Sequence, residues 1–101
     1  MSQAYRLTER AEADVEAIAD YIAADNIDAA VKVVLALEDA FILLASRREI
    51  GHAREDLTDR PLKFWSVYSY LVVYDPASEP LTIVTVLHSA RDVAQILGEI
   101  G

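Results

Sequence analysis

The residues best suited to chemistry lie near the end of the chain. His88 follows the apolar run of residues 81–87, and the pair Arg91-Asp92 comes three residues later. An imidazole can transfer protons near neutral pH, and a guanidinium can stabilise a developing negative charge. The same residues also have structural explanations. His88 can bond a nearby carbonyl at the end of its strand, and Asp92 suits the start of a short helix, with Arg91 tied back to a strand.

Further cations gather in the connection between residues 47 and 63, where they alternate with acids. The cations are Arg47, Arg48, Arg54, Arg60 and Lys63, and the acids are Glu49, Glu55, Asp56 and Asp59. We expect an exposed mixture of charges that largely neutralise one another. His52 lies in the same polar connection and is expected to be solvated. Two histidines without nearby, regularly spaced carboxylates do not form a metal site, so neither a metal nor a cofactor is expected.

Composition narrows the function classes. A chain of 101 residues forms one domain, and 53% hydrophobic residues indicate a folded core with apolar surface to spare for a partner. The net charge of −8 repels phosphate backbones, so nucleic-acid binding in general, sequence-specific binding included, is disfavoured. The chain lacks cysteine, and its first residues do not resemble a signal peptide, so we expect a cytoplasmic protein that does not span a membrane.

The first half of the chain predicts a short strand followed by two helices. Residues 4–7 read as a strand, and Thr8 is a suitable N-cap for the helix that follows. The apolar face of that helix is spaced four, three and four residues apart, which is the helical period. It consists of Ala11, Val15, Ile18 and Ile22. Asn26 or Asp28 can cap the second helix, expected over residues 29–46.

The second helix carries two apolar stripes. The main stripe consists of Ala30, Val33, Val34, Leu37, Phe41 and Leu44, and the second of Val31, Leu35 and Ile42. A helix that is apolar on most sides is buried on most sides. Either the helix lies between the first helix and the sheet, or the second stripe needs another chain.

The second half of the chain predicts three strands and a final short helix. Residues 62–67, 68–74 and 81–87 are rich in β-branched and aromatic types, and residues 75–80 form a turn cluster. Phe64 and Trp65 alternate in direction, so we expect one to face the core and the other a partner. The predicted order is β-α-α-β-β-β-α. This order indicates an α+β fold, with an antiparallel sheet of about four strands covered by the N-terminal helical hairpin.

Several segments, in this order, resemble the ParE/RelE superfamily of small bacterial toxins. They are residues 5–8 with 14–23, Asn26 with Ala29 and Ala30, residues 51–57, residues 70–74, and residues 86–92 (VLHSARD). The resemblance covers nearly the whole chain, as one toxin domain over residues 1–101, and favours the ParE branch. In one respect the chain departs from the family pattern, because toxins of this class are often basic and this chain is acidic.

The resemblance implies a toxin of a type II toxin–antitoxin pair that stops growth by binding DNA gyrase, without catalysis. It implies a cognate antitoxin, with a ribbon-helix-helix end like ParD, that forms a hetero-oligomer with the toxin. The expected target-binding residues are Arg60, Lys63, His88 and Arg91. The expected antitoxin-binding residues are Val31, Leu35, Ile42, Val93, Ile96 and Leu97.

Two alternatives stay open. The RelE branch cleaves messenger RNA on the ribosome, which requires an acid–base pair and cations that stabilise the charged phosphorus centre. Arg60, Lys63, His88 and Arg91 are the candidates for that role too. The final residues 93–101 lack Tyr, His, Lys and Arg, which disfavours this alternative. The second alternative is a non-toxic interaction module that pairs with an antitoxin-like regulator.

Overall fold

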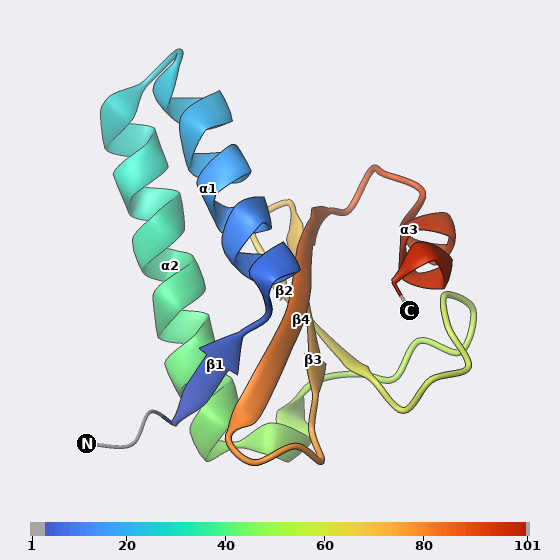
Figure 1. Cartoon of the computed structure of the whole chain (residues 1–101). Coiled ribbons are helices and arrows are strands. Elements are labelled where there is room, and N and C mark those ends of the chain that lie inside the picture. Colours follow the sequence, from blue (N-terminus) through green and yellow to red (C-terminus); the bar gives the residue numbers. More distant parts are fainter. Residues whose placement is uncertain (1–3, 101) are drawn as a thin grey trace.

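The computed structural model describes residues 4–100, which form a four-stranded sheet with helices on both faces (Figure 1). In chain order the elements are β1 (Tyr5–Leu7), α1 (Glu9–Ala23), α2 (Ile27–Ser46), β2 (Lys63–Val67), β3 (Tyr70–Asp75), β4 (Leu81–His88) and α3 (Val93–Glu99). A short 3-10 helix, Arg48–Ile50, follows α2. The predicted order and the α+β fold class are confirmed. Within residues 4–100, no helix has both the length and the apolar character needed to cross a bilayer.

Side-chain caps explain where the three α-helices begin. Thr8, Asn26 and Asp92 each accept a hydrogen bond from the backbone N–H three residues later, at 3.0 to 3.1 Å. Each cap satisfies one of the N–H groups that the first turn of a helix leaves without a partner. Thr8 is the predicted cap of α1, and of the two candidates for α2 it is Asn26 that serves.

The sheet has the order β1-β4-β3-β2. The predicted antiparallel pairing holds for β2, β3 and β4. At the other edge β1 pairs parallel with β4, so the sheet is mixed rather than wholly antiparallel. Residue patterns indicate that a segment is a strand but do not set its direction beside a partner more than 70 residues away.

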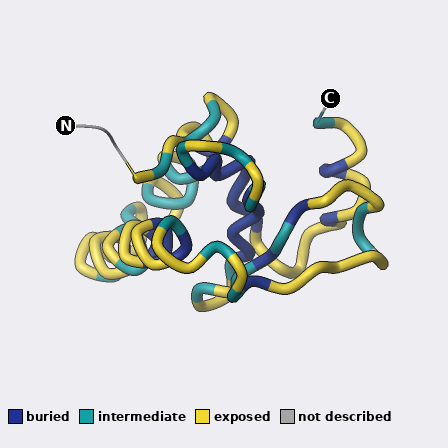
Figure 2. Tube along the Cα trace, turned by 90° about the horizontal axis from the view of Figure 1, so that it is seen from below, coloured by how far each residue is buried: buried dark blue, intermediate teal, exposed yellow. Residues whose placement is uncertain are grey.

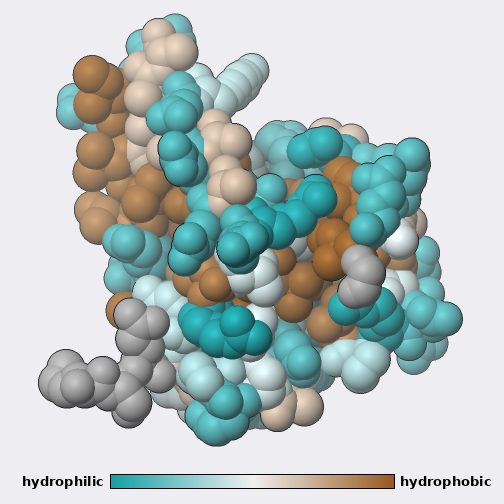
Figure 3. All heavy atoms as spheres, viewed as in Figure 1, coloured by the Kyte–Doolittle hydropathy of each residue, from teal (hydrophilic) through white to brown (hydrophobic). Residues whose placement is uncertain are grey.

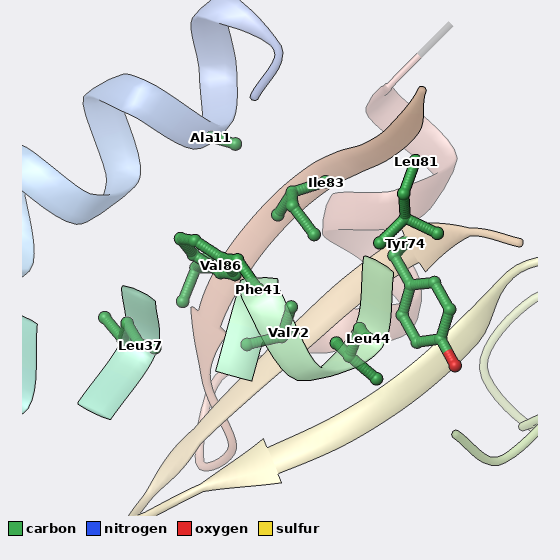
Figure 4. Close-up of a cluster of buried hydrophobic side chains, with 9 residues drawn as sticks. All are labelled: Ala11, Leu37, Phe41, Leu44, Val72, Tyr74, Leu81, Ile83 and Val86. Carbon is green, nitrogen blue, oxygen red and sulfur yellow. The ribbon is translucent and has the colours of Figure 1, made fainter. Parts of the chain in front are cut away.

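Two apolar cores lie on opposite faces of the sheet, and in Figure 2 the buried segments occupy the middle of the molecule. The core under α1 and α2 contains Ala11, Leu37, Phe41, Leu44, Val72, Tyr74, Leu81, Ile83 and Val86 (Figure 4). The core under α3 contains Leu62, Phe64, Leu71, Val73, Val84, Leu87, Val93, Ile96 and Leu97. The last helix therefore covers the face that the helical hairpin leaves open.

Coverage of both faces changes the interpretation of two aromatic residues. Phe64 is 2% exposed in the core under α3, and Trp65 packs against the core under the helical hairpin. The expectation that one of them would face a partner is wrong. Alternate residues of a strand point to opposite faces, and here both faces are covered.

Candidate functional site

One candidate site lies where the sheet ends beside α1. His88 is the last residue of β4 and pairs with Tyr70, the first residue of β3. Their rings meet edge to face, with centroids 5.4 Å apart and planes at 86°. Asp14 and Tyr21 of α1 and Arg91 line a cavity of about 350 Å³ with them. We call these five residues the sheet-end site.

The His88 ring is held by its own turn. Its Nδ1 accepts a hydrogen bond at 3.0 Å from the backbone N–H of Ala90. In the neutral ring the proton therefore sits on Nε2, which faces away from the turn bond. Among residues 4–100 the structure shows this acceptor bond, and not a bond to a carbonyl, as the hydrogen bond of the ring. Because this bond occupies the Nδ1 lone pair, only Nε2 of His88 remains to contact a partner.

The Asp14 carboxylate has a structural role. Its Oδ2 accepts hydrogen bonds from the Thr85 hydroxyl and, at 3.0 Å, from the Val86 backbone N–H. The Arg10 guanidinium lies 3.9 Å from the same oxygen. β1 pairs with β4 only as far as Ile83, so the carboxylate occupies the edge of β4 beyond the end of β1. This carboxylate fastens α1 to β4.

The sequence contains a signal for the structural role of Asp14 that the predicted site residues do not include. Glu12, Glu16 and Asp20 follow one another at four-residue spacing on the wet face of α1. Asp14 falls outside that row, and its side chain is only 17% exposed. An acid out of register with the polar face of an amphipathic helix is a candidate for a buried contact.

The four predicted target-binding residues do not form one site. Lys63 begins β2 and pairs with Tyr74, at the opposite end of the sheet from His88, and its Nζ lies 3.4 Å from the Gly51 carbonyl. The Arg60 guanidinium donates to the Ile100 carbonyl at 2.9 Å. Only His88 and Arg91 come together. The grouping is corrected because antiparallel pairing places the starts of β2 and β4 at one end of the sheet and His88 at the other.

The second candidate site is an apolar groove between α1 and α2. It encloses about 310 Å³ and is lined by Ala19, Asp20, Ala23, Ile27, Ala30, Val31, Val34 and Leu35, which we call the helix-pair groove. Ile27, Val31 and Leu35 are 70%, 53% and 55% exposed. Ile42 is 57% exposed further along α2. Figure 3 shows apolar side chains gathered along the outer side of α2. The second stripe of α2 is therefore surface, as expected if it needs another chain.

Three other residues expected on that surface are buried. Val93, Ile96 and Leu97 are 4%, 8% and 2% exposed, on the side of α3 that packs against the sheet. They supply the apolar face with which α3 covers the sheet, so they are core rather than partner surface. The prediction is corrected for these three residues.

Two exposed tyrosines are not among the predicted binding residues. Tyr21 is 74% exposed and lines the cavity of the sheet-end site. Tyr68 is 69% exposed in the turn between β2 and β3, with a φ of 53°. A positive φ is uncommon for a bulky residue. Tyr21 stands out in the sequence as a large aromatic residue off the apolar face of α1.

The charged connection is only partly the solvated mixture that we expected. Arg54 pairs with Asp56 at 2.8 Å, and this exposed pair raises the pKa of Arg54 and lowers that of Asp56. Arg48 behaves differently. Its guanidinium pairs with Glu79 at 3.0 Å and donates to the Pro76 carbonyl at 3.2 Å, so it ties the end of α2 to the β3–β4 turn.

Comparisons with known proteins agree with this fold. Among solved structures, the chain is similar to "Chromosomal ParDE TA system from P. aeruginosa", with a TM-score of 0.67 and 18% sequence identity. That match covers 83% of this chain and 92% of the other. A comparison with curated proteins gives no match. A family model described as "ParE toxin of type II toxin-antitoxin system, parDE" matches residues 5–93. The chain belongs to this ParE toxin family.

Proposed function

We propose that this toxin inhibits DNA gyrase by binding to it, without chemistry of its own, and that a cognate antitoxin neutralises it in the cytoplasm. Membership of the ParE family supports the proposal. The observation that favours binding over catalysis is the scatter of the cations. Arg60 and Lys63 are engaged by carbonyls away from the ring of His88, so no cluster of cations surrounds it within residues 4–100. Cleavage of RNA needs several cations around one phosphate.

We place the target contact at the sheet-end site. Its exposed groups are His88, Arg91 and Tyr21, an aromatic and cationic set of the kind that carries binding energy in protein interfaces. Arg60 and Lys63 lie elsewhere and serve as comparison positions.

We place the antitoxin contact at the helix-pair groove and along the exposed stripe of Val31, Leu35 and Ile42. Such a contact requires apolar surface that is exposed to water when the toxin is alone. The groove offers that area on α2, away from β4 and His88. An antitoxin with a ribbon-helix-helix end, encoded by the neighbouring gene, is the partner that we expect to cover it.

The test is a supercoiling assay with purified gyrase, relaxed plasmid and ATP. We expect added toxin to block supercoiling and to trap linear, cut DNA, and we expect antitoxin to restore activity. Gyrase that works normally at high toxin concentration contradicts the proposal. Translating ribosomes would then be the next substrate, with cuts in messenger RNA as the readout.

A further inference from the structure

Almost all of the net negative charge of the chain lies in the helical hairpin formed by α1 and α2. Residues 9–46 carry nine carboxylates and two cations, a net charge of −7 out of −8 for the whole chain. Within residues 4–100, the ion pair of Arg10 with Asp14 is the only one formed between two residues of the hairpin. The other hairpin carboxylates are exposed, and none of them forms an ion pair with a cation of residues 4–100.

One of these carboxylates lines the helix-pair groove, and others lie on the same helix faces nearby. Asp20 lines the groove, and Glu16 and Glu12 precede it by one and two turns on the same face of α1. On α2, Glu38 and Asp39 lie between the apolar positions of the exposed stripe. Glu12 lies in the first turn of α1, where the helix dipole favours a carboxylate. Like charges spaced four residues apart destabilise a helix slightly, so Glu16 and Asp20 bring the toxin no such gain.

We infer that the helix-pair groove receives an amphipathic helix whose apolar stripe is flanked by lysines and arginines. This inference rests on the proposed function, since the helix belongs to the antitoxin. Apolar side chains of the partner would cover Ile27, Val31 and Leu35, while its cations would face Asp20 and the row on α1. The antitoxin segment is then basic, matching a toxin that is acidic.

The dimensions of the stripe set the length of this helix. Ile27 and Ile42 are fifteen residues apart, which at 1.5 Å per residue is about 22 Å. A partner helix of roughly fifteen residues spans that length, with apolar residues three and four apart. A groove between two packed helices is suited to a third helix, which completes a three-helix layer.

Charge also argues against other occupants. A second copy of this chain would bring another hairpin of net charge −7 to the same surface. Nucleic acid and anionic lipid are repelled by the same row of acids. A basic helix alone converts the row from a repulsive surface into an attractive one.

The experiment compares two variants with equal changes in net charge. The groove variant carries Glu12→Gln, Glu16→Gln and Asp20→Asn. The control variant carries Glu55→Gln, Asp59→Asn and Glu99→Gln, which are exposed acids outside the hairpin. Affinity for the antitoxin of the neighbouring gene is measured by calorimetry at 50 and 500 mM NaCl. The groove variant would lose three surface ion pairs with the antitoxin, so we expect it to bind about tenfold more weakly at low salt. We expect the affinity of the control variant to change less than twofold.

Two synthetic helices separate this inference from the proposed function. They share one apolar stripe and carry either Lys or Glu at all flanking positions. We expect the Lys peptide to bind wild-type toxin at low salt, to lose affinity in 500 mM NaCl, and to compete with the antitoxin. Equal binding of both peptides, tighter binding of the Glu peptide, or no loss of affinity in the groove variant overturns the inference.

If the protein of the neighbouring gene does not bind the toxin, the proposed partner is wrong, and the peptides still decide the chemistry of the groove. A toxin that dimerises through this face in light scattering also overturns it.

Discussion

The Tyr74 hydroxyl and the Gly51 backbone form a close buried contact that joins the core to the long connection before β2. The hydroxyl accepts from the Gly51 N–H at 3.0 Å and donates to the Arg48 carbonyl at 2.8 Å. In Figure 4 the Tyr74 hydroxyl points away from the other core side chains. A Cβ at position 51 would overlap this oxygen and would lie 2.8 Å from the ring carbon Cε1, so only glycine fits beside the ring.

Gly51→Ala is expected to destabilise the toxin by about 1–3 kcal/mol, because the added methyl must displace a buried aromatic ring. Urea denaturation followed by circular dichroism measures the change. Gly98→Ala is the matched control, since a Cβ at that position in α3 has no contact within 4 Å among residues 4–100. There we expect no loss, and a gain of about 0.5–1 kcal/mol from helix propensity. Equal stability of Gly51→Ala and wild type contradicts the close contact.

Alkaline pH should destabilise the fold through Tyr74 and Tyr5. Burial raises the pKa of Tyr74 above its ordinary 10.0, and the nearby Glu49 adds to this, while the Gly51 N–H opposes it. Burial and then Glu38 raise the pKa of Tyr5. These two tyrosines ionise at a lower pH in the unfolded chain than in the folded protein. Their contribution to the free energy of unfolding is therefore fully present below pH 10 and is lost as the pH rises above 10. Melting temperatures from pH 8 to 11 measure it, and Tyr74→Phe should flatten the alkaline decline. A parallel decline in that variant would assign the effect to other groups.

Asp14→Ala is expected to cost about 1–3 kcal/mol, because the Val86 N–H and the Thr85 hydroxyl lose their acceptor at the edge of β4. Glu16 is an exposed acid on a different face of α1, so Glu16→Ala should change the stability by less than about 0.5 kcal/mol. Thermal unfolding by calorimetry compares the two. Similar values for both variants would mean that Asp14 does not fasten α1 to the sheet.

The sheet-end site should govern gyrase inhibition. His88→Ala and Arg91→Ala are each expected to raise the inhibitory toxin concentration about tenfold or more, the loss typical of a residue that contributes strongly to an interface. Lys63→Ala, at the other end of the sheet, should inhibit like wild type. The readout is plasmid supercoiling, with circular dichroism to confirm folding. Full potency of both sheet-end variants places the gyrase contact elsewhere.

Leu35→Asp should weaken antitoxin binding about tenfold or more while leaving the toxin folded, because Leu35 is 55% exposed on the groove. Leu37→Asp, two residues along the same helix, should unfold the protein, because Leu37 is fully buried and an unpaired carboxylate there is costly. Calorimetric titration and circular dichroism measure the pair. Unchanged antitoxin affinity in a folded Leu35→Asp variant would remove the groove from the interface.

The sequence alone determined the helices, the strands and their order. Thr8 and Asn26 cap helices with the backbone N–H three residues later, and the four-residue spacings of α1 repeat one helical face. Such signals are local, since they depend on residues within a turn or two of one another. The exposed stripe of α2 could be predicted for the same reason, because its apolar residues lie outside the main apolar face of the helix.

Only the tertiary structure decided which groups come together. Lys63 and His88 are both strand-end residues in the sequence, yet pairing register sets them at opposite ends of the sheet. Val93 and its neighbours in α3 read equally well as surface or core until the helix is known to cover the second face. Asp14 reaches Val86 across 72 residues of chain. Contacts of this kind follow from strand direction, register and layer order, which residue periodicity within a segment does not encode.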